Sequence, residues 1–295
     1  MLTDSFGRTV KNLRIAVTNR CNLNCIYCHR EGENNPGKEM SAERIAEIAE
    51  AFYELGVKKL KITGGEPLLR DDICEIISLM PEFEEISLTT NGMFLDDVAF
   101  DLKESGLDRV NISLDTLNPE IFRFITSGGD ITRVIEGIRS AVEANLTPIK
   151  LNMVLMKNLN DMEVFKMLEF ASSFNKGKTN VILQLIELIP NSKTKDFYLS
   201  PEKFEEEFSR ISTAIKIRDM HKRKQFFTPF GIVEIVKPLE NTDFCMHCNR
   251  IRVTSDGKIK LCLMSDETVN ISNLCGDELK RAIIEAVKLR RPFFR

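Results

Sequence analysis

Residues 13–28 read LRIAVTNRCNLNCIYC, and this stretch decides the fold. Its first six residues predict a short buried strand, because they are rich in Leu, Ile and Val. Three cysteines follow, Cys21, Cys25 and Cys28, with three and two residues between them. We therefore expect a strand whose carboxyl end leads directly into a group of three thiols.

The following part of the chain alternates strands with helices. Five more strands are predicted, at residues 59–63, 86–90, 109–114, 149–155 and 181–188. Amphipathic stretches lie between them at about residues 41–55, 71–80, 97–105, 132–144 and 161–174, and a further helix is predicted after the last strand, at about residues 201–214. Each strand after the first is thus reached through a helical crossover, as parallel strands require. Six such units are too few for a closed eight-stranded barrel, so a partial (β/α)6 TIM-like barrel and a doubly wound α/β sheet both fit.

Composition excludes several classes of protein. With 295 residues, 43% hydrophobic and 29% charged, the chain can bury a large core, and we expect one large domain plus a smaller appendage. A net charge of −3 argues against broad electrostatic binding to nucleic acid or anionic membranes. No apolar run approaches the ~20 residues that span a bilayer, and no signal peptide is read. We therefore expect a cytoplasmic protein with reduced thiols, in which grouped cysteines indicate metal rather than disulfides.

The first three cysteines alone leave two metals open. A 4Fe–4S cluster is normally held by four thiolates, so three leave one iron free for another ligand. Zinc is the alternative, with His29 as a possible fourth ligand. Polar residues also end the other predicted strands, at residues 64–67 (GGEP), 89–92 (TTNG), 113–115 (SLD), Asn152 and Glu187. Barrel enzymes build their active sites at the carboxyl ends of the strands, so these motifs favour the partial barrel and an enzyme.

A second group of cysteines lies near the carboxyl terminus, at Cys245, Cys248 and Cys262. Cys275, thirteen residues further on, could complete a four-cysteine zinc ribbon. Arg250 and Arg252 would share one face of the intervening segment if it is extended. Two guanidinium groups beside a metal suit a triphosphate, so an iron–sulfur site that binds a nucleotide and a structural zinc site both remain open.

Together these motifs resemble the radical S-adenosylmethionine superfamily, through Cys-x3-Cys-x2-Cys with Tyr27 before the third cysteine, followed by GGEP. More narrowly, LRIAVTNRCNLNCIYC, KITGGEPLLR, LTTNG, VNISLDTL and CMHCNRIRVTSDGKIKLCL look like the GTP 3′,8-cyclase family of molybdenum cofactor biosynthesis. The likeness runs from about residue 6 to residue 263. It implies a partial-barrel core over residues 1–215 and a small carboxyl-terminal extension over residues 216–295, which carries a second cluster and a GTP-binding segment.

The resemblance implies two 4Fe–4S clusters and S-adenosylmethionine as cofactors. The catalytic cluster would be held by Cys21, Cys25 and Cys28, and its open iron would bind S-adenosylmethionine through the amino and carboxylate groups. Further implied contacts to S-adenosylmethionine are Tyr27, Gly65, Ser113 and Ile189. An auxiliary cluster, whose open iron binds the guanine of the substrate, would be held by Cys245, Cys248 and Cys262.

The implied substrate is GTP, and the residues implied to hold it are Arg14, Lys61, Thr89, Lys150, Arg250 and Arg252. A 5′-deoxyadenosyl radical would take hydrogen from carbon 3′ of the ribose, and the ribose radical would add to carbon 8 of guanine. The product would be (8S)-3′,8-cyclo-7,8-dihydroguanosine 5′-triphosphate. The family also implies an external electron donor and a downstream pterin-forming partner enzyme, with this chain acting as a monomer or homodimer.

The sequence departs from the family at three places. Gln184 stands where the family often has arginine, Ile189 where it has methionine, and the chain ends without the paired glycines of many relatives.

Two rival functions are a radical S-adenosylmethionine enzyme that modifies peptides and a zinc-binding interaction module. Away from the motifs, we expect Cys74 in the core and His221, which begins a basic run, in a solvated loop.

Overall fold

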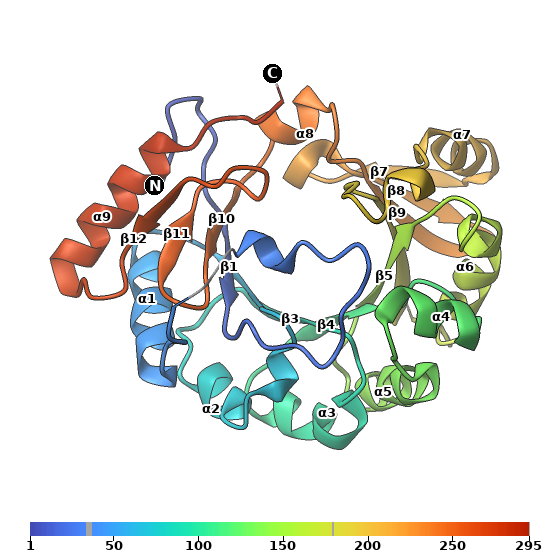
Figure 1. Ribbon diagram of the computed structural model, residues 1–295, viewed down its shortest axis with the longest axis horizontal. Helices are drawn as coiled ribbons and strands as arrows, with labels where there is room; N and C mark the ends of the chain where they lie inside the picture. Colours follow the sequence, from blue (N-terminus) through green and yellow to red (C-terminus); the bar gives the residue numbers. More distant parts are fainter. Residues whose placement is uncertain (34–36, 179, 295) are drawn as a thin grey trace.

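The computed structural model describes residues 1–33, 37–178 and 180–294. One sheet of twelve strands runs through it, in the order β12-β11-β10-β1-β2-β3-β4-β5-β6-β9-β8-β7. Figure 1 shows this sheet curling around an open centre, with helices on its outer side. The strands are β1 (Asn12–Ala16), β2 (Lys59–Thr63), β3 (Glu85–Thr90), β4 (Arg109–Ser113), β5 (Ile149–Leu155), β6 (Val181–Glu187), β7 (Ala214–Ile217), β8 (Lys224–Thr228), β9 (Gly231–Val236), β10 (Arg250–Val253), β11 (Lys258–Lys260) and β12 (Thr268–Asn270).

Strands β1 to β6 are all parallel, and neighbours in sequence are neighbours in space. This order, with the helices on one side, is that of a partial barrel and excludes a doubly wound sheet, in which the strand order reverses at a switch point. The predicted strands at residues 59–63 and 149–155 are confirmed at both ends. Three of the other predicted strands differ from the observed ones by one residue at one end, and the first differs by one residue at its start and two at its end.

Most helices cover the outside of this barrel, and α8 lies at the gap between the two edges of the sheet (Figure 1). They are α1 (Ala42–Glu54), α2 (Ile73–Ser78), α3 (Leu95–Glu104), α4 (Pro119–Thr126), α5 (Ile131–Glu143), α6 (Val164–Ser172), α7 (Glu202–Ile211), α8 (Thr242–Met246) and α9 (Gly276–Leu289). Short 3-10 turns are η1 (Arg30–Gly32), η2 (Pro67–Leu69), η3 (Asp161–Glu163), η4 (Lys195–Phe197) and η5 (Met220–Lys222). Of these helices, α4, α8 and α9 lie outside the stretches that the sequence predicted.

Helix α1 shows why such a segment becomes helical. The Ser41 side chain caps it by accepting a hydrogen bond from the Arg44 backbone N–H. Ile45, Ile48 and Phe52 recur at helical spacing and are fully buried against the sheet. Each buried side chain of this size contributes about 1.5–3 kcal/mol to folding, so the apolar face decides the position of the helix.

The part of the chain after residue 213 supplies both edges of the sheet. On one edge, β9 pairs with β6 in parallel, and β8 and β7 continue antiparallel. On the other edge, β10 pairs with β1 in parallel, and β11 and β12 continue antiparallel. The segment that carries α8 crosses from one edge to the other (Figure 1). The carboxyl-terminal part of the chain therefore flanks the open side of the barrel.

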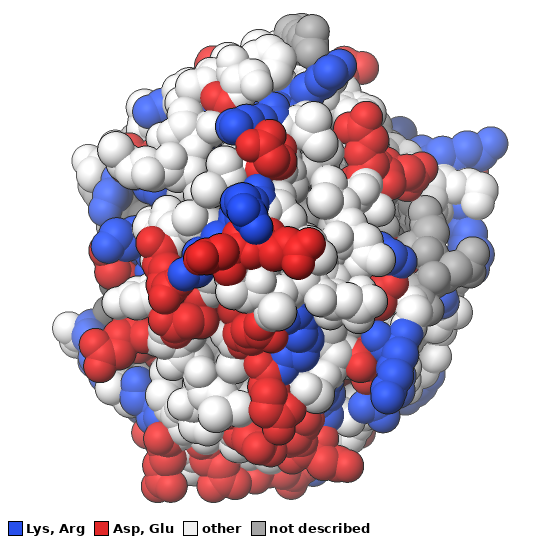
Figure 2. All heavy atoms as spheres, turned by 90° about the vertical axis from the view of Figure 1, so that its left-hand side faces the viewer, with Lys and Arg blue, Asp and Glu red and all other residues white. Residues whose placement is uncertain are grey.

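The main core joins apolar side chains from the strands with those of the covering helices. Cys74 packs against this core, as predicted. Figure 2 shows the face that carries α1 and α9, where acidic side chains gather towards the lower part and basic ones are scattered between them. Of the helices in the described ranges, none has both the length and the apolar character needed to cross a membrane.

Candidate active site

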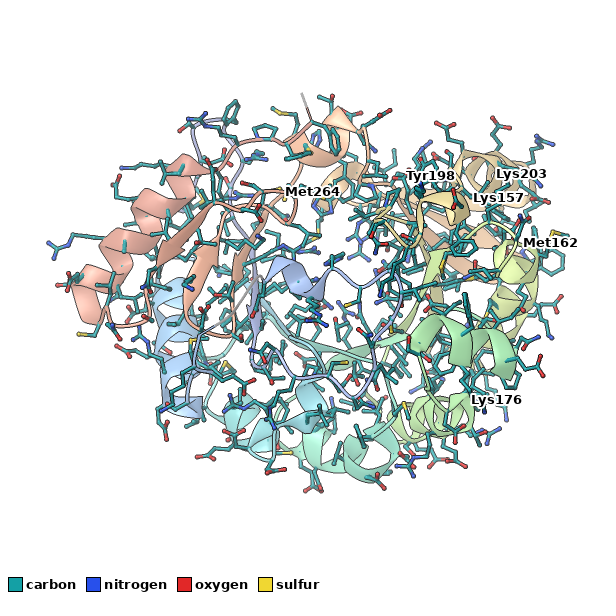
Figure 3. The ribbon with its side chains drawn as sticks, viewed as in Figure 1. Lys157, Met162, Lys176, Tyr198, Lys203 and Met264 are labelled. Atoms are coloured by element: carbon teal, nitrogen blue, oxygen red, sulfur yellow. The ribbon has the colours of Figure 1, made fainter. Side chains whose placement is uncertain are left out.

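The open centre of the barrel holds a cavity of about 410 Å³, a size typical of small-molecule sites. The predicted site residues that line it are Arg14, Tyr27, Cys28, Lys61, Thr89, Ser113, Lys150, Ile189, Cys245, Cys248, Arg250, Arg252 and Cys262. Figure 3 shows side chains filling this centre, with Met264 at its inner rim and Lys157 and Met162 on the outside. The fold thus gathers residues from strands far apart in the chain into one cavity.

The loop after β1 presents the first three thiols, which we call the first triplet (Cys21, Cys25 and Cys28). The loop is fixed on the end of α4, where Asn24 N–H and Ile26 N–H donate to the Thr126 and Ile125 carbonyls at 3.1 and 2.9 Å. The sulfur atoms themselves accept backbone hydrogen bonds, Cys21 Sγ from Leu23 N–H at 3.4 Å and Cys28 Sγ from Arg30 N–H at 3.3 Å. Donors aimed at sulfur stabilise thiolates, the form that binds metal.

Neighbouring strand ends support the loop that carries the first triplet. Gly64 and Gly65 lie directly against it, since a Cβ atom on Gly65 would fall 2.1 Å from the Arg20 carbonyl oxygen. Glu66 is buried and accepts hydrogen bonds from Thr90 Oγ1 and Asn91 N–H, both at 2.7 Å. Burial raises the pKa of Glu66 to about 7. The GGEP motif therefore fastens the ends of β2 and β3 to this loop, and Gly65 itself lies behind the cavity wall.

Tyr27 is held in a fixed position between the first triplet and the barrel. Its hydroxyl donates to Asp115 Oδ2 at 2.8 Å, and Asp115 Oδ1 accepts the Val154 N–H at 2.8 Å. Asp115 is buried, which raises its pKa to about 6. Ser113 lies just before it at the end of β4 and lines the same side of the cavity as Tyr27.

The second triplet (Cys245, Cys248 and Cys262) lies across the cavity, on α8 and on the loops before β10 and after β11. All three thiols line the cavity. Cys275 is exposed at the N-terminus of α9 and does not line it, which argues against a zinc ribbon completed by this residue. Among the residues that the structure describes, no group of three or more Cys, His, Asp or Glu side chains is arranged around a single metal ion.

Arginine side chains from β1 and β10 meet beside a carboxylate. Arg14 and Arg252 are register partners in the parallel pair, and both point towards Glu31 of η1. Glu31 contacts Arg14 Nη1 at 2.8 Å and Arg252 Nη1 at 2.6 Å. Burial alone would raise the pKa of Glu31, but the two guanidiniums lower it well below its usual range. Arg250 lies two residues before Arg252 and lines the same cavity, as the predicted alternation required.

Two further predicted residues have side-chain atoms without a hydrogen-bond partner in the part of the chain that the structure describes. The Lys61 Nζ and Thr89 Oγ1 atoms are buried, line the cavity and make no hydrogen bond within the described part of the chain. Burial, reinforced by Arg109 and Arg14, lowers the pKa of Lys61. A buried ammonium and hydroxyl without partners are costly, so this side of the cavity suits an oxygen-rich anionic ligand.

Sequence reasoning missed a second ion-pair cluster. Glu234 on β9 is fully buried and contacts Lys150 Nζ at 2.8 Å, Arg223 at 2.7 Å and Arg218 at 3.2 Å. Gln184 donates to the same carboxylate at 2.7 Å, so it replaces the family's arginine with a neutral contact. The one available signal was a lone glutamate in the apolar strand GIVEIV, since a buried charge requires partners.

The prediction for His221 is wrong. This residue is buried, its ring stacks on Phe244 at 3.7 Å between centroids, and it lines the cavity. His221 and Arg223 turn inwards, and Arg223 pairs with the buried Glu234, while Lys222 and Lys224 of the same run are exposed as predicted. Charge in a short run of sequence therefore did not mean exposure to solvent.

Comparison with known proteins shows the family of the chain. Residues 15–171 match the Radical SAM superfamily, and residues 181–294 match Molybdenum Cofactor Synthesis C. A protein named "Probable GTP 3′,8-cyclase" from Archaeoglobus fulgidus is 57% identical over 295 residues, covering 100% of both chains. A protein of the same name from Methanocella arvoryzae is 42% identical over 297 residues, covering 100% of this chain and 95% of the relative.

Solved structures share the fold at low sequence identity. Streptococcus suis SuiB bound to S-adenosylmethionine has a TM-score of 0.64 at 16% identity, and the match covers 93% of this chain and 64% of SuiB. Native anSMEcpe with bound AdoMet has a TM-score of 0.58 at 18% identity, covering 94% of this chain and 84% of that chain. The chain therefore belongs to the radical S-adenosylmethionine superfamily and, within it, to the family whose members are named GTP 3′,8-cyclase.

Proposed function

We propose that this chain is a GTP 3′,8-cyclase, a radical S-adenosylmethionine lyase that converts GTP to (8S)-3′,8-cyclo-7,8-dihydroguanosine 5′-triphosphate in molybdenum cofactor biosynthesis. One observation carries the proposal: Cys28 of the first triplet and all three thiols of the second line the same cavity, which several cations line as well. The family match and the names of the relatives support the same function.

The three free thiols of each triplet fit a 4Fe–4S cluster with one open iron. With S-adenosylmethionine on the open iron of the first triplet, this group supplies the 5′-deoxyadenosyl radical. Tyr27, Ser113 and Ile189 line the cavity and are proposed to position that ligand. Gly65 is proposed to act through the backbone of its loop, because its missing side chain allows the loop to lie against Arg20.

The opposite side of the cavity is proposed to hold GTP. Arg14, Arg250 and Arg252 would bind the triphosphate, because guanidinium groups suit phosphate oxygens. Lys61 and Thr89 offer a buried ammonium and hydroxyl that have no hydrogen-bond partner among the described residues, and Lys150 adds a cation from β5. By fixing the ribose and the base together, these residues would bring carbon 3′ and carbon 8 within bonding reach.

The proposal also covers the division of the chain and its partners. Residues 1–215 would form the radical core, and residues 216–295 would carry the auxiliary cluster and part of the GTP site. An electron donor must come from outside the chain, and a separate pterin-forming enzyme would consume the product. We expect no nucleic acid or membrane partner, a monomer or homodimer, and a cytoplasmic location, since six metal-binding thiols need a reducing compartment.

Anaerobic turnover with S-adenosylmethionine and dithionite tests the proposal. GTP should accelerate formation of 5′-deoxyadenosine and yield the cyclic nucleotide, while ATP should do neither. If 5′-deoxyadenosine forms equally fast with and without GTP, the substrate assignment fails and a peptide substrate becomes the better hypothesis. If the reconstituted protein instead holds two zinc ions and no iron, the radical chemistry itself is excluded.

A further inference from the structure

The two ends of the chain meet behind the second triplet. Asp4 lies near the amino terminus, and its side chain is fully buried. Its Oδ2 atom contacts Arg8 Nε at 2.8 Å and Arg290 Nη1 at 3.1 Å. Arg290 follows α9 directly and is itself 1% exposed. One carboxylate thus fixes two buried guanidiniums whose residues are 282 positions apart in the sequence.

Each of these arginines also holds one cysteine of the second triplet. Arg8 Nη1 donates to the Cys245 carbonyl oxygen at 2.9 Å. Arg290 Nη2 donates to the Cys248 carbonyl oxygen at 3.0 Å and approaches Cys248 Sγ at 3.6 Å. These contacts fix the backbone at two of the three thiols, and one of them brings a positive charge to a sulfur atom.

The same two arginines each have a side-chain nitrogen that makes no hydrogen bond within the described residues. Arg8 Nη2 and Arg290 Nε are buried and have no hydrogen-bond partner among the described residues. Both residues line the cavity, and both are more than nine-tenths buried. With one carboxylate for two guanidiniums, the group keeps a net positive charge beside the thiols. Unused donors and net positive charge both indicate an anionic acceptor at this place.

We infer that Asp4, Arg8 and Arg290 are positioning residues for the auxiliary cluster, and that they hold its thiolates in place and compensate its negative charge. The inference rests on the proposed function, which places an iron–sulfur cluster on the second triplet. Hydrogen bonds and positive charge near the sulfur ligands raise the reduction potential of such a cluster. The chain's two termini would therefore control how firmly, and at what potential, the second triplet holds iron.

The test compares Arg290→Ala, Arg290→Lys and Arg8→Ala in the full-length, anaerobically reconstituted protein. Arg281→Ala, an exposed arginine on α9, is the matched control. Iron release to a chelator and the potentials of both clusters are measured, the latter by redox titration followed with electron paramagnetic resonance. The cluster whose signal changes when S-adenosylmethionine is added belongs to the first triplet and serves as an internal reference.

We expect Arg290→Ala and Arg8→Ala to accelerate iron release from the second triplet by roughly ten- to a hundredfold, the usual effect of losing a residue that supports metal ligands. The potential of the second cluster should fall in both variants, while that of the first stays unchanged. Arg290→Lys keeps the positive charge but not the planar set of donors of the guanidinium. The potential of the second cluster should therefore stay closer to the wild-type value than the rate of iron release does.

Wild-type behaviour in both alanine variants, equal to that of Arg281→Ala, would overturn the inference. An alanine variant that loses both clusters and its far-UV circular dichroism has unfolded, and Arg290→Lys then provides the test. A lysine variant with the same cluster potential and the same rate of iron release as the wild type would again refute the inference. A wild-type protein without a second cluster would instead refute the proposed function, and the two failures are thereby distinguished.

Discussion

Replacing Glu234 with glutamine should destabilise the protein more than any surface substitution of the same kind. Glu234 is fully buried, and three cations surround its carboxylate: Lys150 at 2.8 Å, Arg223 at 2.7 Å and Arg218 at 3.2 Å. Glutamine keeps the shape but removes the only negative charge among these contacts. The buried cations would then lack compensation, which is the costly outcome when one partner of a buried ion pair is removed.

The magnitude follows from the electrostatics of the site. Burial alone would raise the pKa of Glu234, but Lys150, Arg223 and Arg218 outweigh it and lower the pKa from 4.5 to about 2. A pKa difference of about 2.5 corresponds to about 3 kcal/mol, in line with the ~3–5 kcal/mol measured for broken buried pairs. Because the folded-state pKa is lowered, this stability is present above pH ~4.5 and is lost as the pH falls towards 2.

Thermal unfolding of the reconstituted protein under anaerobic conditions is the assay. At ~2–4 °C per kcal/mol for a chain of roughly this length, Glu234→Gln should lower Tm by about 6–12 °C at pH 7. Glu206→Gln is the control, because Glu206 and its partner Arg210 are both exposed, and exposed pairs contribute little. Equal Tm values for the two variants would refute the reasoning. So would the absence of a deficit at pH 6, where Glu234 is ionised and Lys150, whose pKa burial lowers to about 7, is charged.

Two further changes test the nucleotide side of the cavity. Glu31→Gln removes the carboxylate between two arginines, so GTP should bind about tenfold more tightly in equilibrium titration, a gain of ~1.4 kcal/mol. This gain is smaller than the ~4 kcal/mol between two unit charges 4 Å apart at an effective dielectric of about 20. Weaker binding would instead mean that Glu31 orients the arginines for the substrate. Lys61→Met replaces a buried ammonium that has no partner among the described residues, so Tm should rise by a few degrees, equivalent to ~1–3 kcal/mol. The affinity for GTP should fall at the same time. An unchanged affinity would show that Lys61 does not bind GTP.

Local patterns predicted the barrel well. The alternation of apolar runs and amphipathic stretches predicted β1 to β6 within one or two residues, because each short strand carries buried Leu, Ile or Val residues. The same patterns placed Thr89 and Ser113 at one cavity, since both lie near the carboxyl ends of parallel strands, which meet at one rim. Periodicity and strand order were sufficient for these residues.

Contacts between distant parts of the chain could not be read in this way. The pairing of β10 with β1, and with it the meeting of Arg14 and Arg252, joins segments more than two hundred residues apart. Glu31 was missed because its role depends on that pairing, and Asp4 because its partners Arg8 and Arg290 lie at opposite ends of the chain. No local period encodes such contacts, which the three-dimensional packing alone creates.

The late pairing of β1 with β10 has a consequence for how the protein is made. During synthesis β1 emerges early, but β10 follows only after most of the chain, so until then one side of β1 has no strand beside it. The 220 residues that separate Cys28 from Cys248 take roughly 10–40 s to add at ~5–20 residues per second. For that interval the nascent chain presents the thiols of the first triplet and not yet those of the second, so under the proposed function the first triplet can receive its cluster before the second triplet exists.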